Sequence, residues 1–173
     1  MAAKFATDPL ATKQSDNPLW RFSLEVYGKP NVADELLRLQ DECEADVLWL
    51  LTALWLASQS LKLSPEQLQQ PVYERWRAQM IRPIRQLRRA CDKTLTPALY
   101  EHLKKAELEA EREGTWLLCK AFADRLSGAA NPDMALNPDR TLNQEKVNDI
   151  AQANLSVCLG KHGHGNELLR CLT

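Results

Sequence analysis

The chain has 173 residues, of which 45% are hydrophobic and 26% are charged, and its net charge is −1. This length and composition favour one globular domain and exclude a collagen-like or largely disordered chain. The near-zero charge excludes binding to polyanions through overall charge and leaves open only a local basic patch. Five cysteines without a C-x-x-C spacing favour reduced thiols over a disulfide framework.

Residues 1–16 are expected to be disordered, and they lack the run of roughly 7–15 apolar residues that a secretory signal needs. The strongest apolar run, 47–57, is shorter than the roughly 20 residues of a membrane-spanning helix. We therefore expect a cytoplasmic protein that has no membrane contact.

Helix starts recur along the chain with the same chemistry. Asn17, Ser64 and Thr96 each precede a proline, so that a side-chain oxygen caps the helix and proline occupies its first position. No stretch alternates apolar and polar residues as a strand would. The sequence predicts an all-α fold, with a short turn near 65–70 and helices near 18–27, 31–43, 45–61, 72–93, 97–127 and 142–159.

The helix at 45–61 is apolar on all sides, which is typical of a helix surrounded by others. We expect it to be the centre of a single bundle domain over 17–127. Pro83 is expected to kink helix 72–93, and Gly114 to bend or divide helix 97–127.

The C-terminal part begins with a predicted linker at 128–140, where Asn-Pro-Asp occurs twice. A C-terminal helix at 141–160 and a flexible tail at 161–173 follow, although the end of the tail could form one helical turn. This region holds residue types that bind zinc, but their spacing fits no zinc pattern, so we expect no metal and no cofactor: Cys158, His162, His164 and Cys171.

Helix 72–93 is the most distinctive stretch, because residues 75–93 carry seven cations and one acid. An apolar arc is formed by Trp76, Met80, Ile84, Leu87 and Cys91. The opposite arc is predicted to bind a partner through Arg75, Arg82, Arg85, Arg89 and Lys93.

Three interpretations of this basic helix remain open. Residues 31–46 carry six acids and one cation, so the two segments can pair within the fold. The arginines can instead bind an acidic protein partner, or nucleic-acid phosphate. Nucleic acid is the weakest of these interpretations, because Trp76, the aromatic residue among these cations, lies on the apolar face and is not placed to stack on bases.

Asp46 directly precedes the apolar helix, where a carboxylate complements the helix dipole. Alternatively, it is a buried acid that pairs with Arg88. A ligand pocket between helices is predicted near Asp46, Trp49, Trp55 and Arg88.

Sequence motifs of catalysis are absent, including nucleophile elbows, phosphate-binding loops and HExxH, and no catalytic residue is predicted. The glutamates between 101 and 113 are expected to form a solvated face. We expect a non-enzymatic interaction protein that binds an acidic partner through the arginine-rich face. A small-ligand protein or enzyme with an interhelical pocket, and a nucleic-acid-binding protein, are the alternatives.

Residues 17–115 also carry a family resemblance. The matching positions are Trp20, Ser23, Leu24, Tyr27, Leu39, Gln40, Asp46, Leu50, Leu51, Trp55, Trp76, Pro83, Leu87, Arg88 and the run Glu107 to Glu111. In these positions the chain resembles a proteobacterial family of about this length, known as a domain of unknown function. Leu48 stands where that family has asparagine. The resemblance implies domain boundaries and a bacterial origin, and it implies no activity, cofactor or catalytic residue.

Overall fold

The computed structural model describes residues 17–129, 140–160 and 165–172, and every regular element in these ranges is helical. The predicted all-α class is confirmed. The expectations for residues 1–16, 130–139 and 161–164 lie outside the described residues. In chain order the elements are α2 (Pro18–Tyr27), α3 (Val32–Cys43), α4 (Val47–Ser58), the 3₁₀ turn η1 (Pro65–Leu68), α5 (Pro71–Trp76), the π-helical turn η2 (Arg77–Ile81), α6 (Arg82–Ala90), α7 (Pro97–Ala121), α8 (Ala123–Ala129), α9 (Arg140–Leu159) and α10 (Asn166–Leu172).

Helix α4 lies at the core, since every residue from Val47 to Ala57 is buried. Helices α2, α3, α7 and α9 all contact it, and α9 packs along it most extensively. The fully buried Asn154 of α9 donates to the carbonyl oxygens of Ala53 and Leu61 and accepts from the amide of Leu63. These bonds satisfy backbone groups that the packing of α4 against α9 removes from water.

Asn17 fixes the start of α2 against α7. Its side-chain oxygen caps α2 by accepting from the amide of Trp20, at 3.1 Å. Its side-chain nitrogen donates to the hydroxyl of Thr115, at 2.9 Å. One buried amide therefore holds α2 across the middle of α7.

The helix predicted at 72–93 is helical without a break over residues 71–90, but a π turn that the sequence did not predict divides it into α5, η2 and α6. The amide of Arg82 donates to the carbonyl of Arg77, five residues earlier, which is π-helical geometry. Pro83 follows directly, and proline has no amide to continue the α-helical ladder. The π turn admits one extra residue, so α6 starts out of phase with α5.

The helix predicted at 97–127 ends at Ala121, and α8 begins after the buried Phe122. Gly114 does not bend or divide α7. It lies where α7 meets α4 and η2, and a Cβ atom there would be 3.0 Å from Cδ1 of Leu48 and 3.2 Å from Cδ1 of Ile81. The absence of a side chain therefore allows close packing.

Replacing Gly114 by alanine is expected to lower the free energy of unfolding by about 1 kcal/mol. The destabilisation from overpacking exceeds the stabilisation from the higher helix propensity of alanine. Urea denaturation followed by circular dichroism measures it. Gly28→Ala is the matched control, since its Cβ would meet only ordinary contacts at 3.5 Å. Equal or higher stability of Gly114→Ala would show that Leu48 and Ile81 move aside freely.

The end of the tail predicted at 161–173, for which one helical turn was allowed, is helical over residues 166–172 and is not flexible there. These residues form α10, which packs against α3 and α9 and buries Leu168 completely. Helices α8 and α9 also cover residues 128, 129 and 140 at the two ends of the predicted linker.

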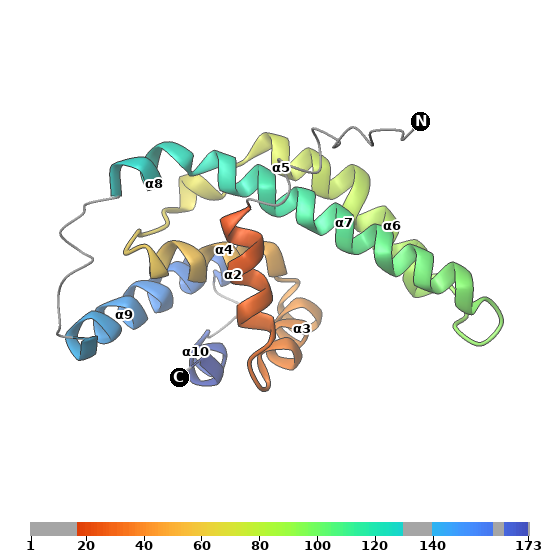
Figure 1. The fold of residues 1–173 in the computed structure, drawn as a ribbon, viewed down its shortest axis with the longest axis horizontal. Coiled ribbons are helices and arrows are strands. Elements are labelled where there is room, and N and C mark those ends of the chain that lie inside the picture. Colours follow the sequence, from red (N-terminus) through yellow and green to blue (C-terminus); the bar gives the residue numbers. More distant parts are fainter. Residues whose placement is uncertain (1–16, 130–139, 161–164, 173) are drawn as a thin grey trace, which may run out of the picture.

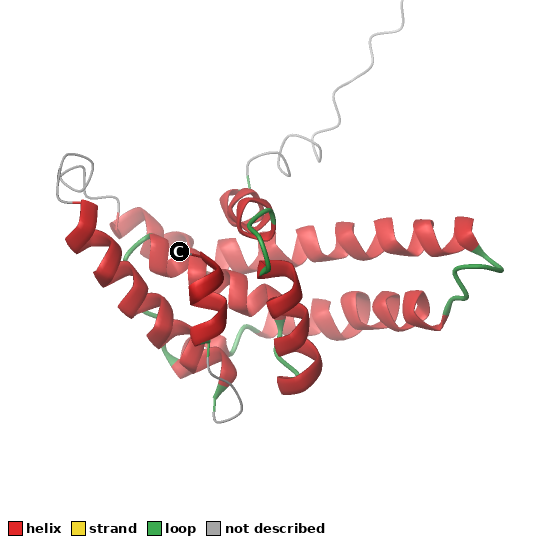
Figure 2. Ribbon diagram, turned by 90° about the horizontal axis from the view of Figure 1, so that it is seen from below, coloured by secondary structure: helices red, strands yellow, loops and turns green. Residues whose placement is uncertain are grey.

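Helices α6 and α7 form an antiparallel pair that extends beyond the other helices (Figures 1 and 2). We call residues 82–105 of this pair the arm, and the loop 91–96 with its flanking turns the tip. The base of the arm lies beside α2 and α3.

Candidate functional site

A cleft of about 690 Å³ lies where the base of the arm meets α2 and α3, and we call it the α2–α7 cleft. Its floor is the apolar surface of α4. It is lined by Trp20, Ser23, Leu24, Tyr27, Leu37, Gln40, Val47, Leu48, Leu51, Arg85, Arg88, Arg89, Tyr100, Glu101, Lys104, Lys105, Glu107, Leu108 and Glu111. The volume lies within the range of ligand-binding clefts.

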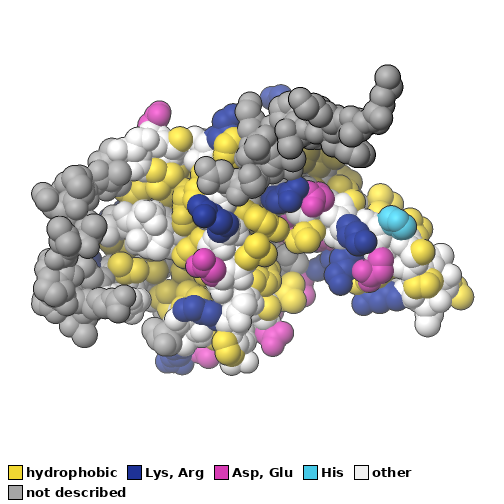
Figure 3. Space-filling model, viewed as in Figure 1, with side chains coloured by type: hydrophobic (Ala, Val, Ile, Leu, Met, Phe, Trp, Pro, Cys, Tyr) yellow, Lys and Arg dark blue, Asp and Glu magenta, His cyan; other side chains and the backbone are white. Residues whose placement is uncertain are grey.

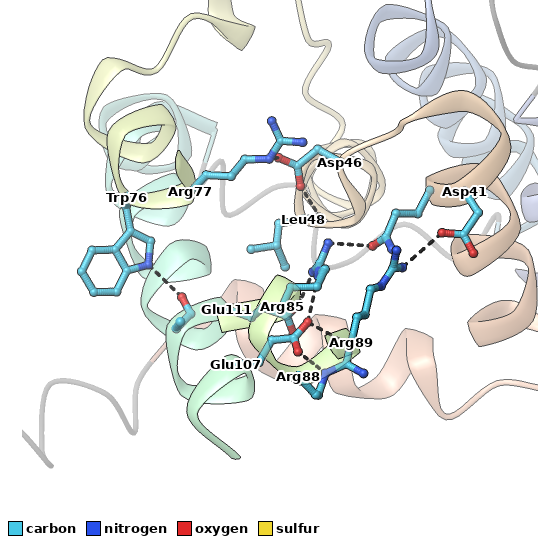
Figure 4. Close-up of polar contacts among 12 residues, drawn as sticks. Asp41, Asp46, Leu48, Trp76, Arg77, Arg85, Arg88, Arg89, Glu107 and Glu111 are labelled. Atoms are coloured by element: carbon cyan, nitrogen blue, oxygen red, sulfur yellow. Dashed lines mark hydrogen bonds and ion pairs between the residues drawn. The ribbon is translucent and has the colours of Figure 1, made fainter. Parts of the chain in front are cut away.

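One wall of the cleft is an ion cluster between α6 and α7 (Figure 4). Arg85 uses three nitrogens: Nε donates to Glu107 at 2.8 Å, Nη2 to Glu111 at 2.6 Å, and Nη1 to Gln40 of α3 at 2.9 Å. Arg88 also donates to Glu107. The cluster therefore joins three helices and supports the wall of the cleft.

The environment shifts the pKa values of the cluster in opposite directions. Burial disfavours the charged form of Glu107, but hydrogen bonds from Arg88 and Arg85 outweigh burial and lower its pKa. Burial raises the pKa of Glu111 and outweighs the attraction of Arg85. Burial, with repulsion from Glu111, raises the pKa of Tyr27 to about 12, so the hydroxyl in the cleft is protonated at neutral pH.

The mouth of the cleft combines exposed apolar and basic side chains. Leu24, Leu37 and Leu108 are 54%, 47% and 50% exposed. Lys104 and Lys105 are exposed as well, and no hydrogen bond or ion pair with another described residue engages either of them. The mouth therefore offers contact area and positive charge that the fold itself does not use.

The pairing of Asp46 with Arg88 is wrong. Asp46 caps α4 by accepting from the amide of Leu48 at 3.0 Å, accepts from the hydroxyl of Tyr73 at 2.7 Å, and pairs with Nε of Arg77 at 2.7 Å (Figure 4). Arg77 belongs to the π turn, which brings it beside the start of α4. Asp46 is thus a cap that also joins α4 to η2.

Of the four predicted pocket residues, Arg88 lines this cleft, and Asp46, Trp49 and Trp55 are not among its lining residues. Trp49 is buried against Tyr73 and Phe122, edge to face, with ring centroids 5.9 and 6.3 Å away. Trp55 is also buried in the core. Both tryptophans face the packed interior around α4.

The residues of the predicted arginine-rich face do not share one environment in the structure. Arg75 and Arg82 are exposed, and no described residue pairs with them. Arg89 pairs with the exposed Asp41 of α3 at 3.2 Å, and the ammonium of Lys93 lies over the Tyr100 ring. Arg85 points inward, so it does not belong to the predicted partner surface. The predicted arcs fail because they assumed one α-helical phase across the π turn.

Sequence reasoning missed Glu107 and Glu111, which were expected to form a solvated face. A signal for them was present, since residues four apart share a helix face and the short loop 91–96 makes α6 and α7 antiparallel neighbours. Leu24, Leu37 and Leu108 were missed because single apolar residues on a helix surface carry no distinctive pattern.

The C-terminal thiol Cys158 packs inside the molecule and donates to the carbonyl of Trp49 at 3.7 Å. Burial raises its pKa to about 12, so it is a neutral thiol. Within residues 17–129, 140–160 and 165–172, no three His, Cys, Asp or Glu residues are grouped to hold a metal ion. Nor is any helix in these ranges long and apolar enough to cross a bilayer.

Fold and cleft together define a small all-α protein with a cleft between its helices. The model of the family described as "Protein of unknown function (DUF2390)" matches residues 18–118, and the chain belongs to this family. All residues that line the cleft lie inside the matched range. No curated protein and no solved structure matches the chain.

Proposed function

We propose that this chain is a non-enzymatic interaction protein, and that its α2–α7 cleft binds an amphipathic helix of an acidic partner protein. The observation that carries the proposal is the group of half-exposed apolar side chains at the mouth, Leu24, Leu37 and Leu108, above a floor of buried α4 residues. Exposed apolar residues that gather around one concavity are typical of interaction sites.

The charge at the mouth favours an acidic partner. Lys104 and Lys105 lie free on α7, and the exposed pair between Arg89 and Asp41 contributes little because solvent screens it. Arg85 and Arg88 are already neutralised by Glu107 and Glu111 and serve as framework. Carboxylates that flank the apolar face of a bound helix would therefore meet the lysines.

The shape favours a helix as the bound element. Leu24 and Tyr27, three residues apart on α2, form one side of the opening, and Leu108 on α7 forms the other. Two helices that flank an apolar floor form the groove in which amphipathic helices are commonly recognised, through anchors spaced three to four residues apart. Figure 3 shows hydrophobic side chains between lysine and arginine side chains on this part of the surface.

The test places a photo-crosslinking amino acid at Leu24 or at Leu108 of the full chain, inside its native cells. A matched control carries it at Val72, which is 66% exposed on α5, away from the cleft. We expect Leu24 and Leu108 to capture the same partner segment, and Val72 not to capture it. That segment should be apolar on one helical face and acidic beside it.

The captured segment is then synthesised as a peptide and titrated. Lys104→Glu with Lys105→Glu should weaken its binding by roughly tenfold or more if each lysine contributes about 1 kcal/mol, whereas Arg75→Glu should not. Equal capture at all three positions would contradict the proposal. So would a peptide that binds the doubly substituted lysine variant as tightly as it binds the parent chain.

A small amphipathic ligand is the second candidate. The observation that favours it is the cavity volume of about 690 Å³, which suits a single organic molecule. The hydroxyl of Tyr27 and the carboxylate of Glu111 would then form hydrogen bonds with its polar groups. A small molecule that co-purifies with the chain and is lost on Leu24→Glu would favour this candidate over a partner helix.

A further inference from the structure

The arm carries a charge that the rest of the chain does not share. Residues 82–105 contain seven lysines and arginines and two acids, a net charge of +5, while the whole chain has −1. Arg85 and Arg88 are neutralised at the base by glutamates outside this range. Lys93 is exposed at the tip, and Arg89, Lys104 and Lys105 are exposed nearer the base, beside the cleft.

The tip also exposes three leucines. Leu95 in the loop is 80% exposed, Leu87 at the end of α6 is 60% exposed, and Leu99 in the first turn of α7 is 52% exposed. The loop between α6 and α7 is the part of the arm that lies farthest from the other helices (Figure 1). Leu95 is the most exposed large apolar side chain among the described residues.

The loop that presents Leu95 is held in place by local hydrogen bonds. One oxygen of Asp92 accepts from the amide and hydroxyl of Thr94, at 2.8 and 2.6 Å, and from the amide of Leu95, at 3.2 Å. The hydroxyl of Thr96 donates to the carbonyl of Asp92. The ammonium of Lys93 is held 4.9 Å above the ring of Tyr100. The exposed leucine thus sits on an ordered turn beside fixed positive charge.

We propose that the tip of the arm binds the surface of an anionic membrane, with Leu95 and Leu99 inserted at the level of the headgroups and Lys93 against lipid phosphates. Apolar side chains beside lysines and arginines are the combination that attaches proteins to anionic lipid surfaces without spanning them. This inference goes beyond the proposed function and does not depend on it, since it uses residues outside the apolar cleft.

A lipid surface suits the tip better than a second protein helix does. The α2–α7 cleft is concave and suits a convex partner, whereas the tip is the protruding end of the arm. A protruding tip can reach a broad surface without contact from the body of the protein. The expectation of no membrane contact rested on the absence of a spanning segment, and surface binding does not need one.

Co-sedimentation of the full chain with vesicles tests the inference. One set of vesicles contains phosphatidylcholine alone, and the other contains phosphatidylglycerol as well. We expect binding to the anionic vesicles only, weaker as salt increases. Lys93→Glu should lower the binding constant by roughly 30-fold, since one favourable charge near the surface is replaced by an unfavourable one. Leu95→Glu should lower it at least as much.

Two controls match these variants on the body of the protein. Val72→Glu introduces the same acid at another exposed apolar position, and Arg75→Glu reverses another exposed cation. Neither should change binding by more than about twofold, because both lie on α5, well beyond a Debye length of roughly 10 Å from the tip. Circular dichroism confirms that each variant is folded.

Four outcomes would overturn the inference. They are equal binding to both vesicle types, equal effects of tip and body variants, loss of binding on Lys93→Glu but not on Leu95→Glu, and binding of duplex DNA in place of anionic vesicles. The third outcome would show a purely electrostatic contact, and the fourth would assign the arm to nucleic acid.

Discussion

Replacing Trp55 by alanine is expected to lower the free energy of unfolding by about 3–5 kcal/mol, the range for a large aromatic side chain removed from a core. Trp55 is 4% exposed, on a helix whose residues from Val47 to Ala57 are all buried. The surrounding helices contact α4 from several sides, so few of them can close the cavity without losing other contacts.

Urea denaturation followed by circular dichroism measures the loss, which avoids the fluorescence that the substitution itself removes. Leu95→Ala is the control, because its side chain is exposed at the tip and should change stability by less than about 0.5 kcal/mol. A loss for Trp55→Ala as small as that of the control would mean that α4 is not the centre of the core.

Replacing Glu107 by glutamine is expected to cost roughly 2–3 kcal/mol at neutral pH, because it leaves two guanidinium groups without their shared carboxylate. The expected value is below that of a fully buried pair, since Arg85 and Arg88 keep about a quarter of their side-chain surface in solvent. Glu111→Gln is the matched control and should cost less, because burial already disfavours the charged form of Glu111 and raises its pKa.

The pH dependence gives this prediction a second readout. The pKa of Glu107 is lower in the folded chain than in the unfolded chain. Its contribution to the free energy of unfolding is therefore complete above the unfolded pKa of about 4.3, and it is lost as pH falls through the folded pKa. The difference in unfolding free energy between Glu107→Gln and the parent chain should therefore shrink below about pH 4. A difference that stays constant with pH would show that the charge of Glu107 does not stabilise the fold.

The helical class and the buried position of α4 could be predicted because they depend on local chemistry. Proline after a cap residue marks the starts of α2, η1 and α7, and a run that is apolar on all sides can be satisfied only by burial. The end of α7 at Ala121 and the helix α10 were not predictable in the same way, because they depend on the packing of Phe122 and Leu168 against distant segments.

The site was harder to predict than the fold for a specific physical reason. The basic helix was correctly identified as unusual, but the direction of each arginine depends on a phase that the π turn changes. The sequence indicates the π turn only through Trp76 and Ile81. They are partly buried and buried, and they are five residues apart, whereas residues on one α-helical face are three or four apart. The cleft itself is built from five helices, α2, α3, α4, α6 and α7, and no single segment encodes it.

The π turn at Arg77–Ile81 sets the rotation of α6 about its axis relative to α5. It holds one residue more than an α-helical path between α5 and α6 would, and each residue rotates a helix by about 100°. A chain that lacked this residue would keep both helices but turn α6 about its own axis relative to α7, moving Arg85 away from Glu107 and Leu87 to another side. Deleting a single residue there would therefore change both the α6 side chains that line the cleft and those exposed at the tip. An insertion in the loop 91–96 would only lengthen the arm.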